Sequence, residues 1–426
     1  MIPDLAGVAA RFGTPTYLYD RADVRRGYAA LRRALPDPSV VYYSVKANPH
    51  PDLAGALARA GSRAEVSSVG EVEAAVAAGF APADILMTGP GKSASDLASA
   101  LAAGVRRFSV DSPVDLARLG DLAERWGAVV SCLLRVNADD AVPGMGLSMT
   151  GTASAFGADA SWVLREPERF VGHAGARVVG LHLYMGTNIG ELETLLAQFE
   201  TSVRLARRLR DALGVPFQEV DLGGGFGAPY ARSGDRPLFD RLAARLEPTL
   251  DEQLPGWRER RPLLAFESGR YLMGGCGWLI AGVVDVKVSK NRTFVVLDSG
   301  INHLGGMSGL RRVPRIVPDL LLGPDGTERP PVEDCAVVGP LCTPLDAWSQ
   351  GVTLPRLDPG DVVAVPTVGA YGLTAGLLAF LGHRPPLEVV VDSDDADAAG
   401  GRGLGAPVSV SRLALVRGFE AGNAAA

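Results

Sequence analysis

The chain has 426 residues, a formal net charge of −6, 47% hydrophobic residues and a mean hydropathy of +0.14. This length and composition predict two domains with sizeable cores, and an acidic balance without a basic stripe argues against nucleic acid as a partner. Because the N-terminus has no basic-then-apolar signal segment and no apolar run reaches roughly 18 residues, we expect a cytoplasmic protein with no membrane partner.

Eight apolar strand candidates follow one another between residues 38 and 275. They are Val40–Ala47, Ala64–Ser68, Ile85–Gly89, Arg107–Asp111, Val130–Asn137, Val178–Gly186, Glu219–Gly224 and Leu263–Glu267. Helical stretches rich in alanine and leucine separate most of them, among them Gly70–Ala78, Ser95–Ala103, Val114–Trp126, Glu191–Leu213 and Leu238–Gln253. This rhythm predicts an α/β fold with a (β/α)8 barrel. A doubly wound open sheet is the alternative, but no G-x-G-x-x-G follows the first strand.

The last third of the chain has a different texture. Its segments are short, β-branched and separated by Gly and Pro: Gly277–Lys287, Thr293–Asp298, Cys335–Val338, Val362–Pro366 and Val408–Val416. They predict a C-terminal all-β domain over residues 276–426, after a barrel over residues 38–275. We expect the segment 1–37 to join the β domain through the strand Pro15–Asp20. The acidic, glycine-rich stretch 392–405 predicts a mobile loop or a disordered insertion.

Lys46 is the first candidate for chemistry, and it is one of only four lysines. It ends the apolar run that begins at Val40, just before the Pro49-His50-Pro51 break. A strand end is a rigid support, and a partly desolvated amine there can be neutral near pH 7 and condense with an aldehyde. A surface lysine is the ordinary alternative.

Two motifs follow the seventh and eighth predicted strands. Gly223-Gly224-Gly225 would let backbone N–H groups close on an anion, and loops at this place in a barrel are a common phosphate site. Glu267 ends the eighth strand, where a carboxylate beside a pyridine nitrogen would keep that nitrogen protonated. An ion pair with Arg270 is the alternative role for Glu267.

The β domain contributes Cys342 and Tyr371. Cys342 is one of four scattered cysteines that lack CxxC or CxxH spacing, so we expect no metal site, no disulfide framework and a reducing compartment. Prolines and glycines surround this thiol and would hold it in a fixed turn. Burial as a small apolar residue is the alternative for Cys342, and packing against backbone is the alternative for Tyr371.

Together these motifs resemble the fold-type III pyridoxal-phosphate-dependent decarboxylases, the family of diaminopimelate and ornithine decarboxylases. The resemblance spans nearly the whole chain and implies an alanine racemase-like barrel, pyridoxal 5'-phosphate as cofactor and a homodimer with shared active sites. It implies that Lys46 binds the cofactor covalently and that Cys342 protonates the product in the neighbouring subunit's site. It also implies that further residues contact the cofactor or substrate, namely Glu65, Ser68, Gly223, Gly224, Gly225, Glu267, Gly269, Arg270 and Tyr371. The strand end Arg135-Val136-Asn137 matches as well.

The sixth strand departs from the family pattern. The family has a histidine that stacks on the cofactor, followed two residues later by Gly-Ser, where this chain has Tyr184 followed by Gly186 and Thr187. His182 lies two residues earlier on the same strand face. We expect Tyr184 to cover the cofactor ring, with His182, Gly186 and Thr187 nearby, while a core role for His182 remains open.

The substrate residues depart too. Diaminopimelate decarboxylases carry an arginine shortly after Asn-Asp-Leu and a Glu directly after the cysteine, where this chain has Asn302-His303-Leu304-Gly305-Gly306 and Thr343. Losing both charges would leave a zwitterionic distal head unpaired. The pattern resembles the branch that decarboxylates aminoacyl groups tethered to a carrier protein in natural-product pathways. Arg270, His303, Thr343 and Asp346 are the expected substrate contacts.

Three alternatives stay open from sequence. One is diaminopimelate decarboxylation in lysine biosynthesis. Another is an amino-acid racemase of related fold, although such racemases usually place an arginine, not a carboxylate such as Glu267, against the pyridine nitrogen. The third is a non-catalytic homologue, which typically lacks the lysine, the cysteine or the β domain.

Overall fold

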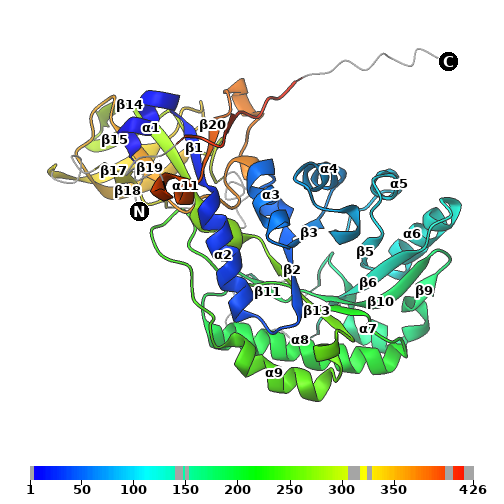
Figure 1. Ribbon diagram of the computed structural model, residues 1–426. Coiled ribbons are helices and arrows are strands. Elements are labelled where there is room, and N and C mark those ends of the chain that lie inside the picture. Colours follow the sequence, from blue (N-terminus) through cyan, green and yellow to red (C-terminus); the bar gives the residue numbers. More distant parts are fainter. Residues whose placement is uncertain are drawn as a thin grey trace, which may run out of the picture. The chain divides into compact units, whose positions relative to one another are not determined.

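The computed structural model describes residues 4–139, 147–148, 153–305, 317–323, 329–398 and 406–416 (Figure 1). Packing divides the chain into two compact units. The barrel unit contains Arg21–Cys276 and Gly369–Tyr371, and the β unit contains Met1–Asp20, Gly277–Val368 and Gly372–Ala426. Within the described ranges, no helix is both long and apolar enough to cross a membrane.

Eight parallel strands of the barrel unit form a closed ring, because the last of them, β13, pairs with the first, β2. In ring order they are β2 (Ser39–Ser44), β3 (Arg63–Val66), β4 (Ile85–Met87), β5 (Arg107–Val110), β6 (Val130–Asn137), β10 (Ala176–Leu183), β12 (Glu219–Asp221) and β13 (Leu263–Ser268). The predicted barrel is confirmed, and each predicted strand overlaps one of these.

Helices connect the strands on the outside of the barrel (Figure 1). They are α2 (Arg21–Ala34), α3 (Pro51–Arg59), α4 (Val69–Ala77), α5 (Ala94–Ala102), α6 (Pro113–Arg125), α7 (Ala160–Arg165), α8 (Leu192–Leu213), α9 (Leu242–Gln253) and α10 (Arg270–Met273). Ser68, Ser93 and Ser112 cap α4, α5 and α6 by accepting a backbone N–H three residues on. These caps end the loops after β3, β4 and β5 within a few residues, which keeps that edge of the barrel compact.

Side chains fill the barrel interior. One apolar cluster draws a residue from each of four strands: Tyr42, Leu86, Leu133 and Ala265. A buried carboxylate, Glu219, accepts a 2.8 Å hydrogen bond from the hydroxyl of Tyr42 and forms an ion pair with Arg107. These partners compensate the buried charge of Glu219. Apolar and paired polar side chains together fill the interior, so it is a packed core rather than a pore.

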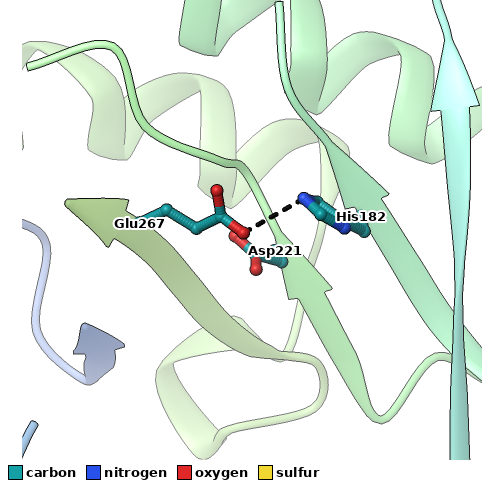
Figure 2. Close-up of side chains that lie close together, drawn as sticks. All are labelled: His182, Asp221 and Glu267. Carbon is teal, nitrogen blue, oxygen red and sulfur yellow. Dashed lines mark ion pairs between the residues drawn. The ribbon is translucent and has the colours of Figure 1, made fainter. Parts of the chain in front are cut away.

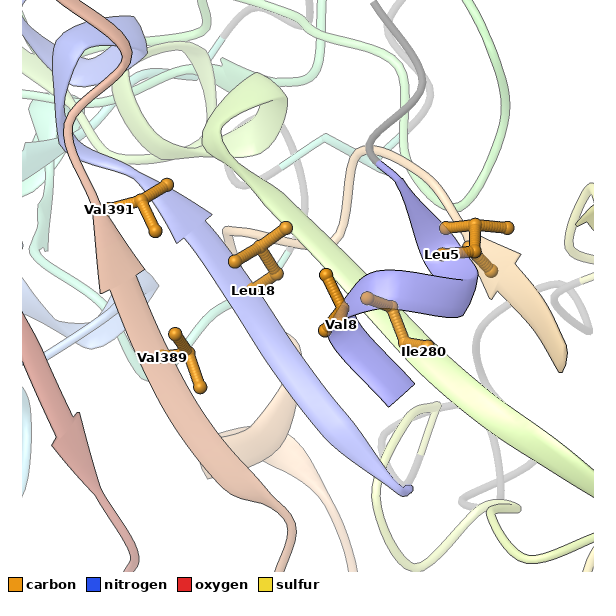
Figure 3. Close-up of a cluster of buried hydrophobic side chains, with 7 residues drawn as sticks. Leu5, Val8, Leu18, Ile280, Val389 and Val391 are labelled. Carbon is orange, nitrogen blue, oxygen red and sulfur yellow. The ribbon is translucent and has the colours of Figure 1, made fainter. Parts of the chain in front are cut away.

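The β unit is built on one nine-stranded sheet. Seven strands follow the order β18-β17-β15-β14-β1-β20-β21, while β19 also pairs with β14, and β16 pairs with β19. Its strands are β1 (Thr16–Asp20), β14 (Gly277–Ser289), β15 (Arg292–Leu297), β16 (Leu321–Leu322), β17 (Pro331–Val338), β18 (Ala347–Pro355), β19 (Val362–Val365), β20 (Leu387–Val391) and β21 (Ser409–Ser411). Helix α1 (Leu5–Phe12) places Leu5 and Val8 against Leu18, Ile280 and Val389 of the sheet (Figure 3).

The N-terminal strand pairs within this sheet, between β14 and β20. Strands β18 and β20 were not among the predicted segments. The predicted loop over 392–405 is wrong in its first half, since helix α11 (Ser393–Ala398) lies there, and residues 399–405 lie outside the described residues.

Candidate active site

Lys46 lies directly after β2, in the short 3-10 helix η1 (Val45–Ala47). Its Nζ lies 3.0 and 3.2 Å from the two carboxylate oxygens of Glu65, which is on the neighbouring strand β3. Glu65 is 2% exposed and also accepts a hydrogen bond from the hydroxyl of Thr88, after β4. Three successive strand ends therefore converge on one ion pair.

The sequence led us to expect that the amine of Lys46 can be neutral near pH 7, whereas its surroundings favour the charged form. Burial lowers the pKa of Lys46, but the carboxylates of Glu65 and Glu267 outweigh that effect and leave the pKa above its ordinary value. Burial likewise raises the pKa of Glu65, and the Lys46 ammonium and the Thr88 hydroxyl reverse this, so the Glu65 pKa is lowered. Without another group present, the pair is an ammonium and a carboxylate, and Lys46 can become a nucleophile only by giving up a proton.

Glu267, His182 and Asp221 form a second buried cluster at the ends of β13, β10 and β12 (Figure 2). The Nε2 of His182 lies 3.1 Å from Oε1 of Glu267, although neither atom makes a well-aligned hydrogen bond within the described residues. The other ring nitrogen, Nδ1, lies 2.8 Å from the hydroxyl of Ser109 on β5. Burial, and next the charge of Glu267, raises the pKa of Asp221, so this carboxyl holds its proton to higher pH than a free aspartic acid.

The predicted glycine turn follows β12, as expected. Gly223 and Gly225 have φ of 73° and 112°, which side chains rarely adopt, and a Cβ on Gly224 would meet the backbone oxygen of Glu267 at 2.7 Å. Gln198 on α8, buried and not anticipated from sequence, donates a 2.9 Å hydrogen bond from Nε2 to the Gly224 carbonyl. The turn therefore lies close beside the end of β13.

Tyr184 comes directly after β10, and the charges of Lys46 and Glu267 both influence the pKa of its hydroxyl, which burial raises. Its hydroxyl forms a hydrogen bond with Thr187, whose neighbour Gly186 completes the short strand β11 (Gly186–Thr187). The guanidinium of Arg135 lies over the Tyr184 ring, with 5.9 Å between the guanidinium carbon and the ring centroid.

Arg270 lies at the start of α10 between two tyrosine rings. Its guanidinium carbon is 4.8 Å from the ring centre of Tyr371 and 5.2 Å from that of Tyr230. The Tyr230 hydroxyl donates a 2.7 Å hydrogen bond to the Tyr371 carbonyl, and the Tyr371 N–H donates to the carbonyl of Ala47. Tyr371 is thereby tied to the segment that carries Lys46. Tyr230 had no signal in the sequence.

Gly269 and Ser68 have local structural reasons for their identity. A Cβ on Gly269 would meet the Cβ of Ala47 at 2.9 Å, so this glycine lets the end of β13 approach the Lys46 segment. Ser68 is exposed and its hydroxyl caps α4, which is the contact the structure gives it.

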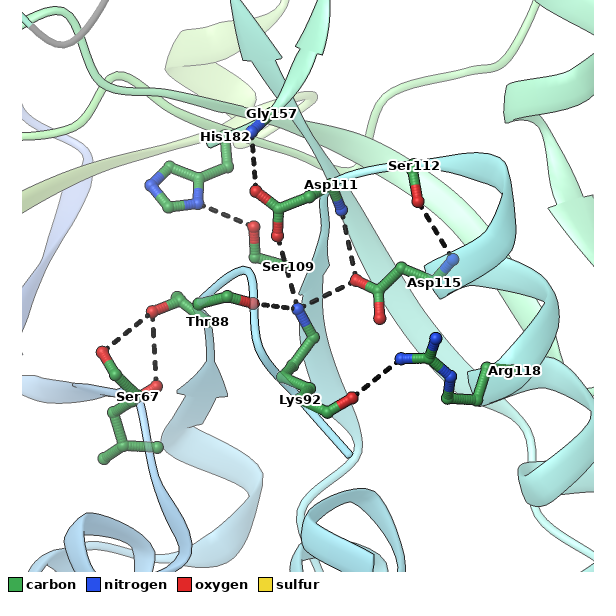
Figure 4. Close-up of polar contacts among 12 residues, drawn as sticks. Ser67, Thr88, Lys92, Ser109, Asp111, Ser112, Asp115, Arg118, Gly157 and His182 are labelled. Carbon is green, nitrogen blue, oxygen red and sulfur yellow. Dashed lines mark hydrogen bonds and ion pairs between the residues drawn. The ribbon is translucent and has the colours of Figure 1, made fainter. Parts of the chain in front are cut away.

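Lys92, a buried lysine, lies in the loop after β4 (Figure 4). Its Nζ lies 2.9 Å from Asp115 Oδ2 and 3.4 Å from Asp111 Oδ2, and it donates to the Gly89 carbonyl. Asp111 also accepts a 2.7 Å hydrogen bond from the N–H of Gly157. This network joins the loops after β4 and β5, and no sequence motif indicated it.

The remaining predicted residues lie in the β unit. Cys342 is exposed and is the free thiol nearest the surface, because Cys132, Cys276 and Cys335 are buried. Asp346 and His303, both 2% exposed, have their side chains engaged within the unit: Asp346 accepts from two backbone N–H groups, and Ser299 and Asn302 contact the ring of His303. Burial lowers the pKa of His303 to about 4. Gly306, part of the predicted substrate motif, lies outside the described residues.

Comparison with known proteins identifies what the chain resembles. Residues 21–274 match the family model described as pyridoxal-dependent decarboxylase, pyridoxal binding domain. The chain is 30% identical to the L-glutamyl-(BtrI acyl-carrier protein) decarboxylase of Niallia circulans over 91% of both chains. It is 33% identical to a diaminopimelate decarboxylase of Pseudomonas fluorescens, over 92% of this chain and 91% of that one. Diaminopimelate decarboxylase of Helicobacter pylori, solved with L-lysine, is 26% identical with a TM-score of 0.78 over 92% of this chain and 94% of that one.

Proposed function

Since the chain belongs to the pyridoxal-dependent decarboxylases, we propose that it removes the α-carboxyl group of an aminoacyl group tethered to a carrier protein. The enzyme class and the cofactor, pyridoxal 5'-phosphate, come with the family. The proposal concerns the substrate, the residues that act on it and the assembly in which they act.

The barrel site fits this cofactor. Buried polar atoms without a hydrogen-bond partner in the described part of the chain include Glu267 Oε1 and Arg270 Nε. Burying a polar atom without a hydrogen-bond partner costs free energy, unless a bound ligand supplies the missing partner. A pyridine nitrogen suits Glu267, a phosphate suits the N–H groups of the glycine turn with Arg270, and the amine of Lys46 suits an aldehyde.

Each side chain then has a task. When bound, the cofactor supplies an aldehyde that joins to amines and a ring that draws off the electron pair left by the departing carboxyl group. Lys46 would hold the aldehyde, and Glu65 would orient the lysine amine through their 3.0 Å contact. Glu267 would keep a proton at the ring nitrogen, and Tyr184 would cover the ring. Cys342 supplies the proton that replaces the lost carboxyl group.

One observation carries the substrate proposal: the residue after Cys342 is Thr343, a neutral side chain whose hydroxyl accepts a 3.3 Å hydrogen bond from the N–H of Leu345. A threonine cannot match the ammonium of a free diaminopimelate or ornithine head, so the site offers no carboxylate there. A thioester-bound aminoacyl group lacks a distal α-amino-acid head and brings binding energy from its arm. The relative from Niallia circulans, whose name includes an acyl-carrier protein, also supports a substrate tethered to a carrier protein.

Diaminopimelate decarboxylation is the second candidate, favoured by relatives of 28–33% identity that carry that name. One measurement distinguishes the two candidate substrates. Carbon dioxide release should be followed for free meso-diaminopimelate, ornithine, lysine, aspartate and glutamate, and for aspartyl and glutamyl groups loaded on a phosphopantetheinylated carrier. We expect turnover of a loaded acidic aminoacyl group and little turnover of free amino acids, with Lys46→Ala as the inactive control. A kcat/KM for free diaminopimelate of roughly 10⁴ M⁻¹s⁻¹ or more would overturn the tethered substrate.

The assembly we propose is a homodimer in which Cys342 serves the partner's site. The family resemblance and the exposure of this thiol support it. The subunit-mixing experiment described in the Discussion tests it.

A further inference from the structure

Asp346 occupies a place that its sequence-based assignment as a substrate contact does not explain. It is 2% exposed and begins the run into β18, four residues after Cys342. Both carboxylate oxygens are used within the β unit: Oδ1 accepts a 2.9 Å hydrogen bond from the N–H of Ile301, and Oδ2 accepts a 2.8 Å hydrogen bond from the N–H of Leu341. A substrate would have to displace one of these bonds to reach the carboxylate.

The two N–H groups belong to two different turns. Ile301 lies in the turn after β15, which carries Asn302 and His303, and Leu341 lies in the turn after β17, which carries Cys342. Strands β15 and β17 are parallel neighbours, with Val296 paired to Val338, so their carboxyl ends lie at the same edge of the sheet. Asp346 therefore fastens the cysteine turn to the histidine turn.

Two glycines make room for this carboxylate. A Cβ on Gly300 or on Gly339 would overlap the carboxylate atoms of Asp346. Neither glycine has positive φ, so the close approach of the carboxylate, not backbone strain, explains the absence of a side chain at both positions.

Backbone bonds complete the cysteine turn. The N–H of Gly339 donates to the Asp346 carbonyl, the N–H of Asp346 donates to the Thr343 carbonyl, and the N–H of Thr343 donates to the carbonyl of Leu341. Cys342 is thus an exposed residue in a turn whose two ends are both bonded to one aspartate. On the other side, the carbonyl of His303 accepts a 2.8 Å hydrogen bond from Tyr17 of β1, which fixes the second turn to the sheet.

We propose that Asp346 is a positioning residue for Cys342: it holds the cysteine turn rigidly against the Asn302–His303 turn, so that the thiol is presented in one orientation. The contact itself is independent of the proposed function, while its catalytic consequence rests on Cys342 being the proton donor. A group that must deliver a proton loses rate steeply when its position is loosened, and substrate affinity changes little.

The matched substitution is Asp346→Asn, which keeps the size of the side chain but leaves only one oxygen for two N–H donors. Asp358→Asn is the control, because Asp358 is an exposed residue of the same unit whose carboxylate pairs with Arg356. The readout is the alkylation rate of Cys342 in the full-length holoenzyme, with Cys342→Ser giving the background from the three buried cysteines. We expect alkylation to rise at least threefold in Asp346→Asn and to stay within 1.5-fold in Asp358→Asn. We also expect kcat to fall at least tenfold with KM within threefold, while cofactor absorbance is unchanged.

An unchanged alkylation rate in Asp346→Asn would overturn the proposal. If that variant does not fold, Gly339→Ala perturbs the same contact from the opposite side and must give the same rise in alkylation. Failure of the proposed function has a separate signature: Cys342→Ala would keep normal turnover, while the alkylation result would still decide the contact of Asp346.

Discussion

Replacing Lys92 by Met tests whether the buried network after β4 stabilises the barrel. Lys92 is 3% exposed, and its ammonium pairs with both Asp111 and Asp115, so its removal leaves two largely buried carboxylates without their cation. Breaking a buried ion pair in this way costs about 3–5 kcal/mol. For a unit of about 250 residues, each kcal/mol shifts the melting temperature by roughly 2 °C, so the barrel transition should fall by about 6–10 °C.

Differential scanning calorimetry of the full chain measures this shift. Lys287→Met is the control, because Lys287 is an exposed lysine on β14 and its loss should change the melting temperature by about 1 °C or less. Adding Asp111→Asn and Asp115→Asn to Lys92→Met removes the two carboxylate charges that have lost their cation. The triple variant should therefore recover at least half of the lost melting temperature. A Lys92→Met barrel that melts within 2 °C of the control would refute the argument that this cluster is net stabilising.

Three further predictions concern attachment, assembly and pH. Lys46→Ala should lose borohydride-fixed cofactor, and mass spectrometry of the wild type should find the label on Lys46; label on another lysine would reassign the site. Cys342→Ala and Lys46→Ala homodimers should each be nearly inactive, and mixing them should restore up to about a quarter of wild-type activity, because half the dimers are mixed and each has one intact site; no recovery after verified exchange would mean that each site uses one chain. Burial raises the pKa of Glu388 on β20 from 4.5 to about 7, so its contribution to stability is fully present below pH 4.5 and is lost as pH rises through 7. Glu388→Gln should therefore stabilise the β unit by about 3 kcal/mol above pH 7 and have little effect below pH 4.5, as followed by urea unfolding across pH.

The sequence predicted what depends on local pattern. Period and length revealed the eight barrel strands, and chain position alone placed Lys46 and Glu267 at strand ends, where the structure has them. The sequence alone could not predict the charge environment of Lys46, because it depends on Glu65 and Glu267, carboxylates that lie 19 and 221 residues away along the chain. The contacts of Asp346 could not be predicted for the same reason: nothing in the sequence reveals that the N–H groups of Ile301 and Leu341 converge on it.

The charges at the strand ends distinguish a decarboxylase from a racemase of related fold. Lys46 compensates Glu65 across a 3.0 Å ion pair, and burial together with the charge of Glu267 raises the pKa of Asp221. In the proposed site Glu267 is the carboxylate that faces the ring nitrogen, and the Nε2 of His182 lies 3.1 Å from its Oε1. A carboxylate in that position favours a protonated ring, which accepts an electron pair more readily than a neutral one. An arginine there would oppose the proton, as expected for a racemase. The buried electrostatics of this barrel therefore suit a reaction in which a full electron pair must be stored when carbon dioxide leaves.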